Sequence, residues 1–356
     1  MNGFTYFQVR EMSHTFITLF KCIKIMEGSL SRNLILTLVP FSLLLLLYSM
    51  HLVNLSLAQE NVLENSWTRG TPMPTPRTEV TSANLDDGIY VIGGFTSDGE
   101  TTAIVEMYNT TSDSWKTDIV PLPIPLHHAS SVSHQDKIYV IGGYMDDWTP
   151  SDRLLAYNPT TNEWTQSSVL PTARGSANSH FVNGTLYVIG GDANEESLNV
   201  VESYDPITKQ WTAHTPMPTA RHHAASAVAD GNIYVIGGRL TNSLVNTDVV
   251  EKYDPSSDSW TTALEPMPSK RSGIAATNVN GFIHVLGGEE NQGTFDSNER
   301  YDPANNIWTI ESPMPTARHG LGVTAFDSKI FVIGGGPRPG LTVSDENEIY
   351  YVNKTS

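Results

Sequence analysis

A glycine pair recurs six times along this chain at almost constant spacing. Successive pairs begin 49, 48, 47, 50 and 47 residues apart, and six tryptophans follow the same period. The two sets are Gly93 and Gly94, Gly142 and Gly143, Gly190 and Gly191, Gly237 and Gly238, Gly287 and Gly288, Gly334 and Gly335, with Trp67, Trp115, Trp164, Trp211, Trp260 and Trp308. A period of this length is typical of stacked copies of one supersecondary unit. The sequence therefore predicts one array of six units.

Each repeat contains the same four short segments, as the fourth copy illustrates. Small and apolar residues alternate over 224–229 before a turn at Asp230 and Gly231, and a buried-type run at 233–236 ends at the glycine pair. Residues 249–253 and 259–262 form two further strand-like segments, separated by the turn residues Asp254 and Pro255. Four antiparallel strands in each of six radial units predict an all-β fold, a six-bladed β-propeller.

The glycines and the periodic tryptophans are interpreted as structural. At a strand end beside the axis, a side chain would obstruct the close approach of neighbouring backbone, which explains the glycines. A tryptophan is large enough to fill the wedge between adjacent blades.

The repeated motif resembles that of the kelch family. IYVIGG, V-E-x-Y-D-P, W and M-P-x-x-R follow one another across residues 62–352, whereas the Gly-His and Trp-Asp pairs of WD repeats do not recur. The chain starts with a fourth-strand segment at 66–68 and ends with a third-strand segment at 347–352. We therefore expect the N-terminal strand to complete the sixth blade and close the ring.

Residues 1–58 are predicted to be a targeting segment. The 27 residues between Arg32 and Glu60 contain no Lys, Arg, Asp or Glu, and residues 56–58 have the small-x-small pattern of a secretory cleavage site. A retained membrane anchor over 34–58 is the alternative, and Met26 is an alternative start to Met1. In either case we expect the propeller, residues 59–356, to be exported, as a secreted or membrane-anchored protein.

Composition excludes several classes of function. The chain has 21 Lys and Arg against 38 Asp and Glu, a formal net charge of −17, which argues against a nucleic-acid partner. The single cysteine, Cys22, lies in the predicted targeting segment, so a disulfide framework and a cysteine-ligated zinc site are excluded. The sequence assigns no cofactor, and a monomer is expected.

Five repeats place an arginine at the end of the M-P-x-x-R segment. These residues are Arg77, Arg174, Arg221, Arg271 and Arg318. One interpretation is a partial cationic ring for a carboxylate or phosphate. The other is an ion pair with the glutamate of V-E-x-Y inside each blade. Blade two has Leu126 and Leu155 at the two positions, and this paired loss favours the structural interpretation.

Histidines follow this position in alternate blades. They are His127, His222 and His319, with His128 and His223 next to two of them. Imidazoles at a similar radius could bind a transition metal or act as acid and base, but histidines at a wet loop are also ordinary surface residues, and no metal site is assigned. If the protein is an enzyme, Arg221 with His222, or Arg318 with His319, are the catalytic candidates.

The variable loops after the glycine pairs form the expected binding face. They combine acidic side chains with aromatic ones, which suits a basic peptide, a cation or a sugar, although acidic loops are also typical of a solvated surface. The candidate binding residues are Phe95, Tyr144, Trp148, Phe295, Asp146, Asp147, Glu195, Glu196, Glu289 and Glu290. Trp148 is the strongest candidate because it is the only tryptophan outside the periodic set.

Two functions agree with these features. The first is a non-catalytic scaffold that binds a protein or glycan partner on the variable-loop face; the motifs G-x-S-x-G and H-E-x-x-H are absent. The second is a carbohydrate-active enzyme, since the chain is similar in length, leader and blade number to kelch proteins that epimerise sialic acid. Kelch copper radical oxidases need a Cys–Tyr crosslink that the propeller cannot form, and the E-x-x-x-D-x-x-x-H run of nitrile-specifier proteins is missing.

Overall fold

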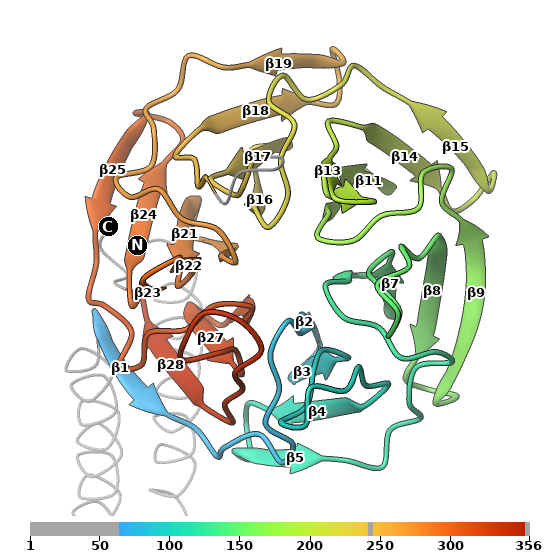
Figure 1. The fold of residues 1–356 in the computed structure, drawn as a ribbon, viewed down its shortest axis with the longest axis vertical. Helices are drawn as coiled ribbons and strands as arrows, with labels where there is room; N and C mark the ends of the chain where they lie inside the picture. Colours follow the sequence, from blue (N-terminus) through green and yellow to red (C-terminus); the bar gives the residue numbers. More distant parts are fainter. Residues whose placement is uncertain (1–63, 241–244, 353–356) are drawn as a thin grey trace, which may run out of the picture. The chain divides into compact units, whose positions relative to one another are not determined.

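The computed structural model describes residues 64–240 and 245–352, so the predicted targeting segment 1–58 and the candidate anchor 34–58 lie outside the described residues. Six four-stranded antiparallel sheets surround a central axis (Figure 1), which confirms the predicted propeller. Within these two ranges the structure has no helix that could span a membrane.

Within a blade the strands are arranged in chain order from the innermost strand to the outermost. Blade one contains β2 (Thr81–Leu85), β3 (Gly88–Ile92), β4 (Val105–Asn109) and β5 (Ser114–Lys116). Blade two contains β6 (Ser130–His134), β7 (Lys137–Ile141), β8 (Arg153–Asn158) and β9 (Glu163–Val169). Blade three contains β10 (Asn178–Val182), β11 (Thr185–Ile189), β14 (Val201–Asp205) and β15 (Gln210–Ala213).

The remaining three blades follow the same order, with one exception at the ring closure. Blade four contains β16 (Ala225–Ala229), β17 (Asn232–Ile236), β18 (Val250–Asp254) and β19 (Ser259–Thr261). Blade five contains β20 (Ala275–Val279), β21 (Phe282–Leu286), β24 (Asn298–Asp302) and β25 (Ile307–Ile310). Blade six contains β26 (Gly322–Phe326), β27 (Lys329–Ile333), β28 (Asn347–Tyr351) and β1 (Ser66–Arg69). Two loops carry short hairpins, β12 (Asp192–Ala193) with β13 (Glu196–Ser197) and β22 (Glu289–Glu290) with β23 (Gly293–Thr294).

The N-terminal strand β1 closes the ring, as predicted. It pairs antiparallel with β28, and Trp67 stands opposite Tyr350 with their ring centroids 5.0 Å apart. The Trp67 indole N–H donates to the carbonyl oxygen of Ser312 in the connection that leaves blade five, at 2.9 Å. The first and last strands of the propeller are thus held by backbone and side-chain bonds together, and β28 has no free edge.

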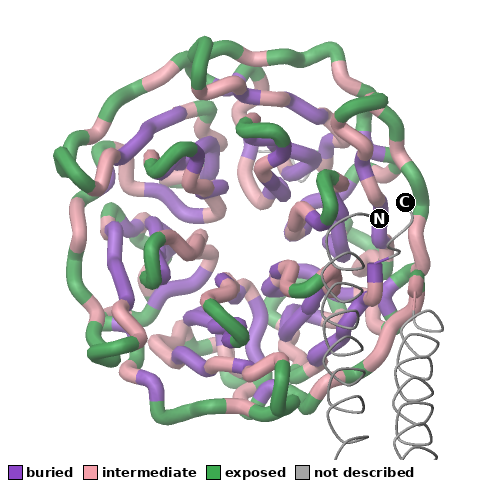
Figure 2. The backbone as a smooth tube through the Cα atoms, turned by 180° about the vertical axis from the view of Figure 1, so that it is seen from behind, coloured by how far each residue is buried: buried purple, intermediate pink, exposed green. Residues whose placement is uncertain are grey.

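The core lies between neighbouring blades. The second strands are almost fully buried, and Figure 2 shows that exposed residues concentrate in the turns and the outermost strands. One hydrophobic cluster joins Ile92 of blade one to Ile138 and Val140 of blade two, and comparable clusters occur around the ring. Since each blade buries one face against the next, no blade has a complete core of its own.

The glycine pairs let the blades approach closely. The amide of Gly94 donates to the carbonyl oxygen of Leu126 in the next blade at 2.8 Å, and a Cβ on Gly93 would collide with that same oxygen. The final copy closes the circle, because Gly335 N–H donates to the carbonyl oxygen of Arg77 at 2.8 Å. These contacts leave no room for a side chain at Gly93 and join each blade to the next.

The periodic tryptophans also join adjacent blades. Trp115 packs on Tyr108 across β4 and β5, with centroids 5.3 Å apart, and its N–H donates to the carbonyl oxygen of Thr71 before blade one at 2.8 Å. The other copies make equivalent Tyr–Trp contacts and inter-blade hydrogen bonds.

Candidate functional site

The repeated arginines are buried inside the blades. All five guanidinium groups are fully buried, and each forms an ion pair with the V-E-x-Y glutamate of its own blade at 2.5–2.9 Å. Burial lowers the pKa of each arginine, and the neighbouring glutamate opposes that shift. Blade two replaces the pair by Leu126 and Leu155, each 1% exposed. The predicted Arg–Glu contact is confirmed, and these arginines have no exposed surface for a ligand.

Residues two positions after the arginine slot form a ring around the axis, which we call the axial ring. Its members are Glu79, His128, Ser176, His223, Gly273 and Gly320. Their backbones are joined from blade to blade: the amide of His128 donates to the carbonyl oxygen of Glu79 at 3.2 Å, and that of Ser176 to His128 at 2.8 Å. The amides of Gly273 and Gly320 each donate to the preceding member at 3.0 Å.

Every member of the axial ring has a left-handed backbone, with φ between 50° and 63°. Glycine adopts this conformation without strain, and blades five and six use it. Glu79, His128 and His223 adopt it at a cost of about 1–3 kcal/mol each, a kind of strain that clusters at functional positions. A Cβ on Gly320 would lie 2.5 Å from Glu79 Oε1, so this glycine also provides the space that the glutamate occupies.

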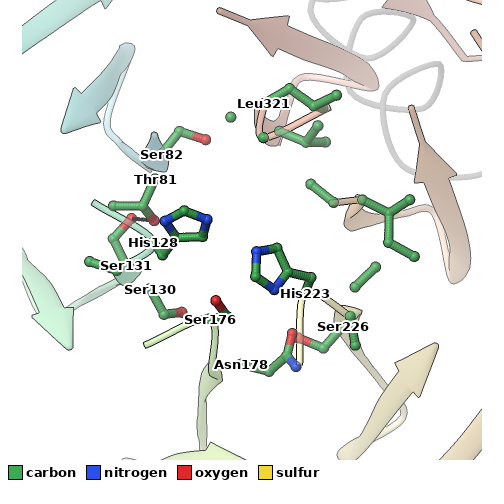
Figure 3. A pocket seen from close by; sticks show the side chains of 18 of the residues that line it. Thr81, Ser82, His128, Ser130, Ser131, Ser176, Asn178, His223, Ser226 and Leu321 are labelled. Carbon is green, nitrogen blue, oxygen red and sulfur yellow. Dashed lines mark hydrogen bonds between the residues drawn. The ribbon is translucent and has the colours of Figure 1, made fainter. Parts of the chain in front are cut away.

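Imidazoles and carboxylates meet at the centre of this ring. His128 Nε2 lies 3.2 Å from Glu79 Oε2, and the His128 and His223 rings are 4.8 Å apart in an edge-on arrangement. Figure 3 shows these two side chains facing each other across the axis. His319 Nδ1–H donates to the carbonyl oxygen of Gly336 at 3.1 Å, which leaves Nε2 facing Glu79 Oε1 at 3.4 Å.

A second layer of histidines supports the first. His127 Nδ1 lies 2.6 Å from His128 Nδ1, and His222 Nδ1 lies 2.5 Å from His223 Nδ1. These are hydrogen-bond distances between two imidazoles, so one ring of each pair donates and the other accepts. His222 in turn lies 3.7 Å from Asp192 Oδ1.

Burial sets the protonation of this cluster. It lowers the pKa of both His127 and His128 to about 3, and it lowers the pKa of His222 and His223 as well. Burial also raises the pKa of Glu79, while the neighbouring His319 and Arg239 oppose the rise. At neutral pH the four imidazoles are therefore uncharged, and each keeps a lone pair on one ring nitrogen.

One cation accompanies the cluster. Arg239, the first residue after the fourth glycine pair, forms an ion pair with Glu289 at 2.7 Å and donates to Ser272 Oγ. Its side chain is 18% exposed, unlike the fully buried arginines of the repeat. Its guanidinium group thus lies at the variable-loop end of the axial ring, the opening that we call the mouth.

A polar channel continues below the axial ring. A cavity of about 180 Å³ is lined by the ring and by hydroxyl-bearing residues of the inner strands, several of which Figure 3 labels. Ser130 and Ser179 share a hydrogen bond at 2.7 Å, as do Thr81 and Ser131, so the hydroxyls link neighbouring inner strands. A further cavity of about 330 Å³ follows along the same strands.

An aromatic cluster lies beside this mouth in blades one and two, formed by Phe95, His127, Tyr144 and Trp148. The Trp148 ring centroid is 4.5 Å from that of His127, 5.6 Å from Tyr144 and 5.9 Å from Phe95. Trp148 is 53% exposed, whereas Phe95 and Tyr144 are 3% and 4% exposed. The two buried rings support the tryptophan from below.

The repeats of this chain match a known protein-family model. The model of the KLHDC2/KLHL20/DRC7 Kelch-repeats domain matches residues 47–217 and 130–335. The chain belongs to the kelch-repeat family. No curated protein matches it.

Solved structures show the same fold. One is the structure of YjhT, which matches with a TM-score of 0.68 and 19% sequence identity over 78% of this chain and 95% of that chain. In all, 1022 chains of solved structures match, so the kelch propeller alone does not select a function.

Some of the residues predicted from the sequence lie at the mouth, together with others that the sequence did not indicate. Of the predicted binding residues, Asp146, Asp147, Glu195, Glu196 and Glu290 are exposed, and Glu289 and Phe295 are half-buried. His222 lies beside Asp192 and His319 beside Glu79 of the axial ring, while Arg221 and Arg318 are buried within the blades. A catalytic role for these four residues stays a prediction.

Glu79 and Arg239 were missed. Neither belongs to a recurring motif, and the axial role of His128 and His223 was assigned to the residues just before them. Aligning the repeats on the arginine slot offers one signal: glycine occurs two positions later in blades five and six. Glycine there indicates a left-handed backbone. A non-glycine residue at the same position in another blade is strained, which indicates a role for its side chain.

Proposed function

We propose that this kelch propeller is a non-catalytic binding module whose variable-loop mouth holds a partner protein, with Trp148 as the central contact. We also propose that it works outside the cytoplasm, secreted or held at a membrane. The location rests on the predicted targeting segment, and the binding role rests on the mouth.

The exposed and fixed side chain of Trp148 carries the proposal. Its backbone is left-handed, with φ of 60°, which is unusual for a bulky residue. The loop is held by the Trp148 amide donating to the Met145 carbonyl oxygen at 2.9 Å and the Met145 amide donating to that of Thr149 at 3.0 Å. A large apolar side chain that is already immobilised loses little conformational entropy on binding, which is the property of an interface anchor.

The surrounding charge favours a basic partner. Asp146 and Asp147 are exposed next to the tryptophan, and the chain has a net charge of −17. A segment with lysine or arginine and an apolar or aromatic side chain complements this surface, because the cation approaches the carboxylates while the apolar group covers the indole.

The experiment is a binding screen on the full chain. Its probes are synthetic peptides that vary in basic and aromatic content, with a glycan array in parallel. Trp148→Ala should weaken the best peptide by at least about 30-fold, the size expected for an interface anchor. Ile207→Ala is the matched control, since Ile207 is 88% exposed in the turn between β14 and β15, away from the mouth loops. Equal binding by the two variants would refute the proposal, and binding to glycans alone would replace the protein partner by a sugar.

A carbohydrate-active enzyme, resembling sialic acid epimerases, is the second candidate. One observation favours it: a carboxyl group with a raised pKa lies 3.2 Å from a neutral imidazole, as Glu79 does from His128. Such a pair can exchange a proton with a sialic acid, and Arg239 would bind the carboxylate of that sugar. Proton NMR of sialic acid with the parent chain and with Glu79→Gln tests it. Interconversion that only the parent accelerates would establish the enzyme.

A further inference from the structure

The imidazoles at the propeller axis are arranged as metal ligands. We propose that Glu79, His128 and His223 bind one divalent transition-metal ion, of the Zn²⁺ class, with a further coordination position open to the axial channel. No metal site is predicted from the sequence, and the histidines singled out there, His127, His222 and His319, stand one residue before the axial-ring position of their blades.

The three residues bring their ligand atoms close together. One ligand atom from each of the three residues lies within 4.8 Å of the other two. His128 Nε2 and Glu79 Oε2 are 3.2 Å apart. Two ligands on a tetrahedral zinc, each about 2.0–2.1 Å from the metal, stand roughly 3.3 Å from one another. The two ligand atoms of His128 and Glu79 therefore already stand at nearly the separation that one ion requires.

A second grouping, Asp192 with His222 and His223, fits less well. Its two imidazoles are only 2.5 Å apart through their Nδ1 atoms. That separation is a hydrogen bond, too short for two nitrogens on one ion. Asp192 and His222 are therefore assigned to the support of His223 rather than to the metal.

The supporting residues have the form that metal sites require. A ligating histidine normally uses its other ring nitrogen in a hydrogen bond that fixes its tautomer and orientation. His128 has such a bond to His127 through Nδ1, and His223 has one to His222. His127 is itself held between Phe95, at 4.1 Å between centroids, and Tyr144. The carboxylate Oδ1 of Asp192, buried and without a hydrogen-bond partner, faces His222 at 3.7 Å.

Charge and access agree with the assignment. Glu79, Asp192 and Glu289 contribute three carboxylates around the axis, and Arg239 contributes one guanidinium, which Glu289 neutralises at 2.7 Å. The three ligands line part of the cavity of about 180 Å³, which has room for water or a small ligand at the open position. Three protein ligands and an open position are typical of zinc sites that bind or activate a small molecule.

The test is metal binding by the full chain, purified with a tag that contains no histidine and treated with a chelator. Titration with Zn²⁺, and with Co²⁺ as a spectroscopic probe, should give one ion per chain and the visible absorption of tetrahedral Co²⁺. His223→Gln and Glu79→Gln should each weaken binding by at least about 100-fold, while His127→Gln should weaken it by about 10–100-fold as a supporting residue. His214→Gln is the control, because its ring packs on Tyr187 away from the axial ring.

The melting temperature of each variant, measured in chelator, separates a lost site from a lost fold. Glu79→Gln is nearly isosteric and keeps the propeller testable if His223→Gln is unstable. A parent chain that binds no Zn²⁺, or a folded Glu79→Gln or His223→Gln variant that binds it within about tenfold of the parent, overturns the proposal. Since Trp148 is not a ligand, failure of the metal site leaves the partner-binding proposal untouched.

Discussion

Arg318 and Glu348 form an ion pair at 2.7 Å, and neither side chain has any exposed surface. Arg318 also donates to the carbonyl oxygen of Val332 in β27 and to that of Gly334, which directly follows this strand. The pair therefore ties the segment before β26 to β27 and β28. Removing one partner would leave a buried charge without compensation, which is more costly than losing the interaction itself.

The first prediction is a double-mutant cycle at this pair. Arg318→Leu and Glu348→Leu should each lower the free energy of unfolding by about 3–5 kcal/mol. The double variant should recover most of that loss, because blade two already has Leu126 and Leu155 at these two positions, both buried. Urea denaturation of the four proteins measures it. Additive losses in the double variant would show that the ion pair is not the source of the effect.

The second prediction concerns ring closure. Trp67→Ala should destabilise the fold by about 3–5 kcal/mol and should selectively raise hydrogen exchange in β28, which would lose the packing of β1. Trp211→Ala is the control, since its ring packs on Tyr204 at 5.1 Å within a continuous chain. The control should cost a similar free energy without affecting β28. Equal exchange of β28 in both variants would contradict the closing role of Trp67.

The fold could be predicted from the repeat, but the arrangement of the loop side chains could not. The strands of blade four follow from alternation and turn residues, and the Arg–Glu pairs follow from their joint absence at Leu126 and Leu155. Both rest on a periodicity of backbone or sequence. The axial ring repeats in its backbone, but its side chains differ from blade to blade. In His127 and His128 two identical side chains are adjacent, and only the left-handed backbone of His128 decides which one faces Glu79.

The third prediction is a pH dependence at His284. Burial lowers its pKa to about 4, and its Nδ1–H donates to Asn298 Oδ1 at 3.0 Å. Below pH 6.5 the unfolded chain binds a proton at this residue while the folded chain does not, so stability is lost as the pH falls from about 6.5 to about 4. The loss is about 3 kcal/mol for this residue alone.

The comparison is between the parent and His284→Gln at pH 8 and at pH 4. Glutamine does not titrate, so the unfolding free energy of the variant should fall less than that of the parent over this interval. The change in unfolding free energy between the two pH values is measured for each protein, and one change is subtracted from the other. The contributions of the other histidines cancel because the two proteins share them. Identical pH dependence in both would show that His284 is not held neutral by the fold.

The last prediction tests the space beneath Glu79. Gly320→Ala would place a Cβ 2.5 Å from Glu79 Oε1 and 2.9 Å from its backbone nitrogen, at a φ of 58°. Gly231→Ala is the matched control, because its φ is 75° and nothing lies within 4 Å of the added atom. Both should lose about 1–2 kcal/mol to backbone strain, and Gly320→Ala should lose about 1–3 kcal/mol more from the collision. Thermal or urea unfolding distinguishes them. If the two variants were equally stable, Gly320 would be needed only for its left-handed backbone and not for the space that Glu79 occupies.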